Sequence, residues 1–164
     1  MSALLAIDPG TAILGWAYFE SRELQCCGIS NASKHKTLSD RIKCHRDNLS
    51  MWLGDVDVAC ERMFYRHAAG GKVKRKDGSV GKIDPQDLID VNLVAGALGT
   101  QWVFPHIWKG SVPKAIHQRR IRSKLLDSEI RVLDKCEVAE SYLHNTVDAV
   151  GIGLWALGRL KGKS

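Results

Sequence analysis

The sequence has no uninterrupted apolar stretch that approaches the roughly 18 to 20 residues of a membrane-spanning helix, and no charged leader with an apolar core precedes its first apolar segment. We therefore expect no membrane partner. The five cysteines form an odd set without a C-x-x-C pair, which argues against a zinc site and against a disulfide framework. Free thiols favour a reducing, cytoplasmic setting, and Cys60, inside an apolar run, is expected in the core.

Length and charge set the next bounds. With 164 residues, of which 45% are hydrophobic, the chain can build one well-buried core but not two ordinary domains. We expect a single α/β domain over residues 1–164. The net charge of +6 favours an anionic partner, because lysines and arginines release counterions when they meet a phosphate backbone. Charge by itself does not specify nucleic acid.

The first part of the chain predicts an antiparallel β-meander. Three short apolar and aromatic segments, separated by turn residues, are typical of strands over residues 3–7, 15–19 and 24–29. The first segment stops at Asp8-Pro9-Gly10, a combination typical of a turn after a buried strand.

Helices and strands then alternate. Apolar spacing predicts a helix over residues 37–53, with Thr37 or Ser39 as its N-cap, and a strand over residues 55–60 that ends just before Glu61. Residues 66–84 combine glycines and charges with few apolar groups, so we expect a mobile basic loop. The later elements are expected to be a helix over 85–98, a strand over 101–104, a basic helical stretch over 109–124 and a buried apolar helix over about 146–160.

Three carboxylates lie at the edges of predicted core elements. Asp8 and Glu61 each end an apolar strand, and Asp148 lies in the apolar last helix. Buried carboxylates are costly unless they are protonated, paired or bound to a metal. If the first and fourth strands are parallel neighbours, Asp8 and Glu61 emerge at the same carboxyl edge of the sheet, and the last helix could bring in Asp148. Such oxygen ligands suit Mg²⁺ or Mn²⁺, and two ions together can hydrolyse a phosphodiester.

Each carboxylate also has an ordinary structural interpretation. Asp8 suits a turn by itself, and Glu61 could pair with Arg62 or Arg66 at the strand end. With Asn145 as N-cap, Asp148 would stand at the third helical position, where a carboxylate closes a capping box. Taken singly, none of the three residues is specific for a metal site.

Three segments, in this order, resemble the motifs of RuvC-like Holliday-junction resolvases. Residues 5–17 (LAIDPGTAILGWA) resemble the family's opening Ile-Asp-Pro-Gly turn and Gly-aromatic second strand. Residues 58–64 (VACERMF) resemble its second acidic segment, and residues 144–153 (HNTVDAVGIG) its terminal acidic helix. The last segment and the compact size look similar to phage-encoded members, which would place the protein in the cytoplasm of a host cell.

This resemblance implies an RNase H-like α/β fold, in which a central mixed five-stranded sheet, its first three strands an antiparallel meander, is flanked by helices. It implies a homodimer that presents two sites to branched DNA, a four-way junction, and makes paired symmetric nicks. It also implies that Asp8, Glu61 and Asp148 hold two Mg²⁺ ions per site, for which Mn²⁺ substitutes, with Asp8 shared between the ions.

The resemblance leaves a fourth ligand open. The family usually carries Asp or His three residues before the last aspartate, where this chain has Asn145, with His144 beside it. His144 could take over metal binding or act as a general base, Asn145 could bind the metal weakly, or Asn145 could only cap the helix. Lys114 resembles a family lysine near the active site and is a further catalytic candidate.

The resemblance also suggests DNA contacts. Phe64 matches an aromatic residue that the family stacks on bases at the crossover, an interaction worth about 1–3 kcal/mol per base; a core aromatic is the alternative. The basic loop and the basic helix would grip phosphates, although any single lysine there could be a merely solvated charge. The predicted DNA-binding residues are Phe64, Arg66, Lys72, Lys74, Arg75, Lys76, Lys109, Lys114, Arg119 and Arg120.

Other functions stay open. Related nucleases that cut forks, flaps or RNA–DNA hybrids use the same carboxylate cluster, and a catalytically silent branched-DNA-binding module would keep the same fold. The segment from Asp8 to Thr11 also fits the first phosphate loop of the actin and sugar-kinase superfamily, but 164 residues cannot supply the two lobes of those enzymes.

Overall fold

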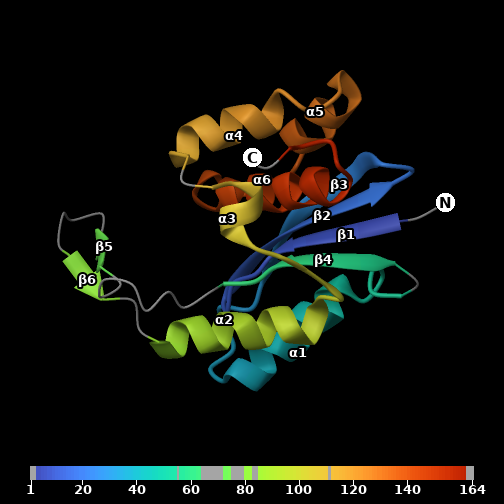
Figure 1. Ribbon diagram of the computed structural model, residues 1–164. Helices are drawn as coiled ribbons and strands as arrows, with labels where there is room; N and C mark the ends of the chain where they lie inside the picture. The colour runs from blue at the N-terminus through green and yellow to red at the C-terminus, as the bar shows by residue number, and fades with distance from the viewer. Residues whose placement is uncertain are drawn as a thin grey trace.

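A computed structural model describes residues 3–54, 56–63, 72–74, 80–82, 85–110 and 112–161, with the backbone alone over 72–74 and 80–82. Its centre is a five-stranded sheet in the order β3-β2-β1-β4-β7 (Figure 1). The strands β1, β2 and β3 form an antiparallel meander, and β4 and β7 continue the sheet parallel to β1. The mixed sheet with an antiparallel start is therefore confirmed. Its strands are β1 (Ala3–Asp8), β2 (Ile13–Glu20), β3 (Glu23–Asn31), β4 (Asp57–Glu61) and β7 (Gln101–Val103).

Helices cover both faces of this sheet (Figure 1). On one face lie α1 (Leu38–Leu49) and α2 (Pro85–Leu98). The other face carries α3 (Pro105–Trp108), α4 (Lys114–Arg122), α5 (Asp127–Asp134) and α6 (Glu140–Ala156), of which α6 packs along β1 and β2. None of the described helices is both long enough and apolar enough to cross a membrane.

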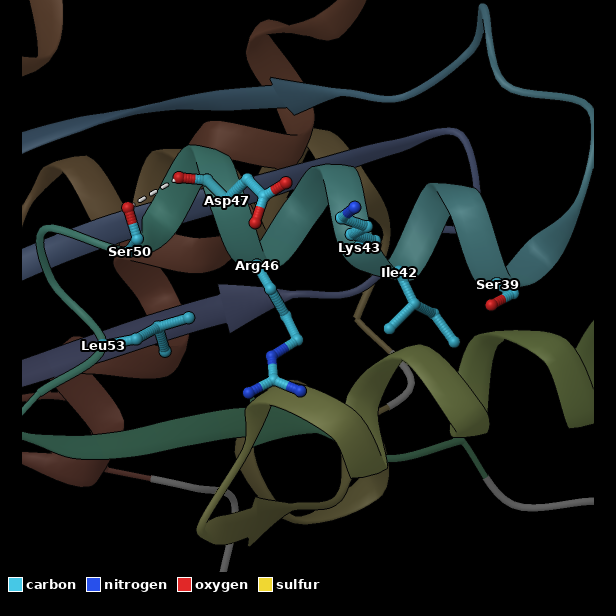
Figure 2. Close-up of a pocket in the computed structure, with 7 residues that line it drawn as sticks. All are labelled: Ser39, Ile42, Lys43, Arg46, Asp47, Ser50 and Leu53. Atoms are coloured by element: carbon cyan, nitrogen blue, oxygen red, sulfur yellow. Dashed lines mark hydrogen bonds between the residues drawn. The ribbon is translucent and has the colours of Figure 1, made fainter.

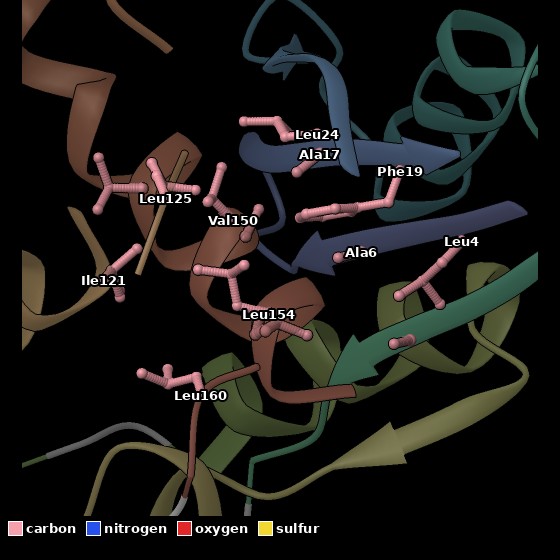
Figure 3. Packing of buried hydrophobic residues seen from close by; sticks show 14 of the residues in the cluster. Leu4, Ala6, Ala17, Phe19, Leu24, Ile121, Leu125, Val150, Leu154 and Leu160 are labelled. Atoms are coloured by element: carbon pink, nitrogen blue, oxygen red, sulfur yellow. The ribbon is translucent and has the colours of Figure 1, made fainter. Parts of the chain in front are cut away.

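The strand β1 supplies side chains to both layers of the core, as a period of two residues requires. Leu4 and Ala6 pack with the residues of α6, whereas Leu5 and Ile7 pack with α1 and α2. Figure 3 shows the layer on the α6 side, where Leu4 and Ala6 face Leu154 and its neighbours. This double burial explains why the first strand is a continuous apolar run.

The last helix begins earlier than the sequence predicted. It starts at Glu140 rather than Thr146, after Ala139 in an extended conformation. Asn145 therefore lies inside the helix, and the interpretation of Asn145 as N-cap and of Asp148 as part of a capping box is wrong. The error arose because the polar first turns of this helix carry too few apolar residues to show a helical period.

The predicted start of α1 is confirmed, whereas its predicted end is wrong. Thr37 is the N-cap of α1, as predicted, and its Oγ1 accepts the amide N–H of Asp40 at 3.1 Å. The helix ends at Leu49 rather than Leu53, because turns follow it. The short helices α3 and α5 were not predicted, since four and eight residues give little periodicity.

Within the predicted basic loop, two short strands pair antiparallel, β5 (Lys72–Lys74) with β6 (Val80–Lys82). The rest of residues 64–84 lies outside the described residues. Cys60 is fully buried, as expected for a core thiol, and all five cysteines are free.

Candidate active site

The parallel pairing of β1 with β4 places two of the candidate carboxylates side by side. Ile7 is the register partner of Cys60, so Asp8 and Glu61 follow on adjacent strands at the carboxyl edge of the sheet. The alternation of side chains turns both toward the α6 layer, because Ala6 and Ala59, two residues earlier, pack in that layer. The predicted parallel neighbourhood of the two strands is confirmed.

The helix α6 adds the third carboxylate. Its backbone at Asn145 and Thr146 lies against Gly15 of β2, where only a glycine leaves room. The Thr146 Oγ1 donates a hydrogen bond to the carbonyl oxygen of Gly28 at 3.2 Å, which ties the helix to β3 as well. Asp148 is thereby held over the sheet edge, close enough to act electrostatically on Asp8.

Burial and neighbouring charges shift the pKa of Asp8 and that of Asp148. Burial raises the pKa of Asp8 well above its usual range, and the charges of Glu61 and Asp148 raise it further, with Lys109 opposing them and a hydrogen bond to the Glu61 side chain adding to the rise. Burial also raises the pKa of Asp148; Lys109 and Lys114 oppose this, and Glu61 adds to it. For both Asp8 and Asp148, burial and the neighbouring carboxylates together outweigh the opposing effect of the lysines.

Glu61 is fixed by the residues at the end of α3. Its side chain is buried, and Oε1 lies 3.0 Å from the Nζ of Lys109 and accepts the indole N–H of Trp108 at 3.2 Å. Burial favours the neutral amine of Lys109, but Glu61, Asp148 and Asp8 outweigh it, so its pKa is raised. The expected pairing of Glu61 with Arg62 is wrong, since the Arg62 guanidinium stacks over the ring of Trp102. The alternative partner, Arg66, lies outside the described residues.

Lys109 and Lys114, predicted as DNA contacts, both line a cavity of about 240 Å³ next to Asp148. Lys114 is exposed at the start of α4, and its charge acts on Asp148, which places it beside the cluster. The whole lining is Lys109, Gly110, Val112, Lys114, His117 and Asp148.

The two fourth-ligand candidates differ in surroundings. His144 lies half-buried on α6, its charge lowers the pKa of Asp148, and it lines a hollow of about 160 Å³ against α4. The backbone of Asn145, the next residue, is in close contact with Gly15.

The predicted DNA-binding residues fall into two groups. Arg119 is exposed on α4, and Arg120, half-buried, donates a hydrogen bond to the carbonyl oxygen of Lys161. Phe64, Arg66, Arg75 and Lys76 lie outside the described residues, and Lys72 and Lys74 are described by their backbone alone.

In donor chemistry and charge, the edge fits a divalent cation. It offers hard oxygen ligands, and a cation would relieve the repulsion that raises the pKa of Asp8. In the described part of the chain, however, no group of three or more His, Cys, Asp and Glu side chains is arranged as a metal cage. Lys109 instead forms the ion pair with Glu61.

A larger hollow, of about 520 Å³, lies along α1 on the opposite face of the sheet (Figure 2). It is lined by the exposed charges of Lys43, Arg46 and Asp47 beside Ile42 and Leu53. With a single exposed carboxylate, it lacks the convergent acids of the sheet edge.

Sequence reasoning missed Trp108 and His117, and it assigned Lys109 to DNA phosphates rather than to Glu61. Trp108 could have been found as a large aromatic residue beside a lysine, just after the fifth strand. For His117 the sequence gives no signal, because a histidine in a basic helix resembles any surface residue.

Comparison with known proteins bears on the fold. No family model matches the chain, and no curated protein matches its sequence. A structure titled "T. thermophilus RuvC in complex with Holliday junction substrate" matches with a TM-score of 0.53 at 13% identity, over 99% of this chain and 100% of that one. A second, "Thermus thermophilus RuvC structure", has a TM-score of 0.47 at 16% identity, over 98% and 99%. The chain has the RNase H-like fold seen in RuvC.

Proposed function

We propose that the protein is a metal-dependent endonuclease that resolves four-way DNA junctions by paired symmetric nicks. The observation that supports it most is the convergence of Asp8, Glu61 and Asp148 at the carboxyl edge of a RuvC-like sheet. The solved RuvC structure with this fold is a complex with a Holliday junction substrate. From the likeness of residues 144–153 alone, the proposal extends to a compact phage-encoded resolvase.

In this proposal Asp8, Glu61 and Asp148 hold two Mg²⁺ ions, for which Mn²⁺ substitutes. When bound, the ions supply activation of a water and stabilisation of the leaving oxygen. The chain's own contribution is to hold the carboxylates in place. Trp108 fixes Glu61 through its indole N–H, and Lys109 balances part of the negative charge.

For the fourth position, we favour His144 over Asn145. The charge of His144 acts on Asp148, whereas the backbone of Asn145 is committed to the contact with Gly15. His144 would bind a cation or move a proton, and Asn145 would keep α6 close to the sheet.

The basic loop and the exposed lysine and arginine side chains of α4 would bind the DNA phosphates. All of these residues would belong to one nuclease domain over residues 1–164. Lys114 is exposed at the start of α4 and lines the cavity beside Asp148, so a phosphate held there would lie close to the reacting bond. Arg119, exposed further along α4, would contact a more distant phosphate. The further contacts proposed are Phe64, Arg66, Lys72, Lys74, Arg75, Lys76, Lys109 and Arg120.

Paired nicks need two sites, which a homodimer would provide. On α2, Ile89 and Leu93, one helical turn apart, are 51% and 52% exposed. Large apolar side chains exposed together favour an interface. Light scattering after size exclusion tests the dimer, with Leu93→Glu expected to yield monomers.

The test of function is a cleavage panel at one salt concentration with Mg²⁺ or Mn²⁺. It compares a four-way junction with a fork, a flap and an RNA–DNA hybrid, for the native protein, Asp8→Asn and the matched control Asp47→Asn on the opposite face. We expect symmetric nicks in the junction with the native protein and the control. Asp8→Asn should bind the junction without cutting it.

Other outcomes would replace the proposal. Cutting of forks, flaps or hybrids in preference to the junction would identify a related nuclease. Junction binding without cutting, together with no heat of Mg²⁺ or Mn²⁺ binding in calorimetry, would identify a catalytically silent branched-DNA-binding module.

A further inference from the structure

His117 combines deep burial with unused hydrogen-bonding capacity. Its side chain lines the cavity of about 240 Å³ beside Asp148, yet the residue is only 2% exposed. Neither ring nitrogen has a hydrogen-bond partner within the described structure. Because buried polar atoms are normally satisfied, an imidazole in this position indicates a ligand that completes its bonding.

The beginning of α4 faces the same cavity through Lys114, its first residue. No described side chain caps this nine-residue helix, whose N-cap is Pro113. The amide N–H groups of a first helical turn have no acceptor within the helix, and the helix dipole favours an anion there. The first-turn amides of α4 and the imidazole, which has no partner among the described residues, are both suited to donate hydrogen bonds to an anion.

One ammonium group of the cavity is available to an anion. Lys109, Lys114 and Asp148 all line it, but Lys109 is paired with Glu61 at 3.0 Å, so the positive charge comes from Lys114. Burial, with the charges of Lys109 and Arg120, lowers the pKa of His117 to about 4. The ring is therefore neutral near pH 7 and presents one N–H donor, and it does not add a third positive charge.

The ring of His117 is held in place by packing against α3. His117 makes an edge contact with Trp108 at 4.7 Å between ring centroids, and Trp108 in turn donates to Glu61. A phosphate in this cavity would thus lie next to the side chains that fix the proposed metal ligands.

We propose that the cavity at the start of α4 is a phosphate-binding subsite, in which the His117 imidazole and the first-turn amides of α4 donate hydrogen bonds and Lys114 supplies charge to one phosphodiester group of the DNA. The inference rests on the proposed function and deepens it, because it names a group that receives the substrate beside the carboxylates. A phosphodiester has two non-bridging oxygens that share one negative charge, and each can accept hydrogen bonds from donors of both kinds.

The first experiment measures junction affinity without divalent ions, so that cleavage plays no part. His117→Phe keeps an aromatic ring against Trp108 and removes the donor, and we expect the dissociation constant to rise about tenfold or more. His117→Gln restores an N–H group and should recover part of the affinity. His35→Phe, at an exposed histidine, is the matched control and should bind like the native protein.

The second experiment observes the ring directly. In ¹H–¹⁵N spectra of the native protein's histidine side chains, dimethyl phosphate should shift the His117 resonances and leave those of His35 in place. Inorganic phosphate, as a separate arm, distinguishes a diester site from a site for free phosphate. A shift with inorganic phosphate alone, with unchanged junction affinity in His117→Phe, would overturn the proposal.

The experiments distinguish failure of the phosphate-subsite proposal from failure of the nuclease proposal. If the native protein cuts junctions while His117→Phe binds them equally well and dimethyl phosphate shifts nothing, the subsite is wrong and the nuclease stands. If the native protein neither binds nor cuts junctions but dimethyl phosphate shifts His117, the anion site stands and the nuclease is wrong.

Discussion

The backbone of Asn145 in α6 lies so close to Gly15 in β2 that a Cβ atom on Gly15 would collide with the Asn145 carbonyl group. The same Cβ would lie 2.9 Å from the amide nitrogen of Thr146. Gly15 is also the register partner of Asp8 across β1 and β2. The absence of a side chain at this one position therefore sets how near α6, and with it Asp148, comes to the carboxylates of the sheet.

Replacing Gly15 with alanine should push α6 away from the sheet. Because the obstacle is backbone in a packed core, we expect a loss of about 1–3 kcal/mol in the free energy of unfolding, together with a loss of junction cutting larger than the loss of fold explains. Urea unfolding and cleavage rates measure the two effects. The control is Gly96→Ala on exposed α2, where a Cβ meets nothing within 4 Å, and it should stabilise by about 0.5–1 kcal/mol. Unchanged cutting in a folded Gly15→Ala protein would contradict the positioning argument.

Local pattern in the sequence was sufficient for part of this site. The apolar runs that end at Asp8 and at Glu61 predicted two strand ends, and their parallel pairing brings those ends together. Asp148 came from the resemblance of its segment to a known motif, while the start of its helix was misplaced because its first turns are polar.

The remaining contacts could not be predicted because they join distant parts of the chain. The ion pair of Glu61 with Lys109 and the hydrogen bond of Glu61 with Trp108 depend on where α3 packs. A four-residue helix has no periodicity that would reveal it. Burial of His117 likewise depends on the packing of α4 against α6 rather than on its own sequence neighbours.

Without metal, the carboxylate cluster should destabilise the fold. Burial and the charges of Glu61 and Asp148 act against an ionised Asp8, so Asp8→Asn should raise the melting temperature of the protein in EDTA. About 1 kcal/mol corresponds to roughly 2–4 °C in a chain of this size. Mg²⁺ should then raise the melting temperature of the native protein and of Asp47→Asn, but not that of Asp8→Asn. An equal response in all three proteins would exclude Asp8 as a ligand.

Lys109 should compete with a divalent cation for Glu61. Its Nζ lies 3.0 Å from Oε1 of Glu61, so Lys109→Gln removes a positive charge from the position where the cation is needed. We expect the Mg²⁺ concentration at half-maximal stabilisation to fall several-fold in thermal titrations. Lys135→Gln, at an exposed lysine after α5, is the charge-matched control and should leave it unchanged. A higher Mg²⁺ requirement in Lys109→Gln would show that the lysine assists rather than opposes the metal.

Far from this edge, a second buried carboxylate should control acid stability. The carboxylate of Glu129 in α5 accepts hydrogen bonds from Nη1 and Nη2 of Arg159, each at 2.6 Å. It also accepts the backbone amides of Leu24 and Leu126 at 2.8 Å. Burial alone would raise its pKa, but Arg159 and the two amides outweigh burial, so the pKa lies below its usual 4.5. The folded state therefore holds this proton less tightly than the unfolded state does.

The sign of the pH effect follows from this difference. Glu129 contributes its full stabilisation above about pH 4.5, where it is ionised in both states, and loses that contribution as the pH falls through its lowered pKa. Glu129→Gln should cost about 3 kcal/mol at pH 7, because it leaves Arg159 without its charge partner. The difference between native and variant should shrink as the pH falls below 4.5, as urea unfolding at several pH values would show.

The exposed pair of Arg122 with Asp134 provides the control for that measurement. Its atoms are 3.0 Å apart, and the side chains are 41% and 56% exposed, so solvent screens the pair to about 0–1 kcal/mol. Asp134→Asn should therefore change the free energy of unfolding little at pH 7. If Glu129→Gln costs no more than Asp134→Asn, burial and the two backbone donors add nothing to the Arg159 pair. The fold would then not depend on the link that Glu129 makes from α5 to β3 and to the end of the chain.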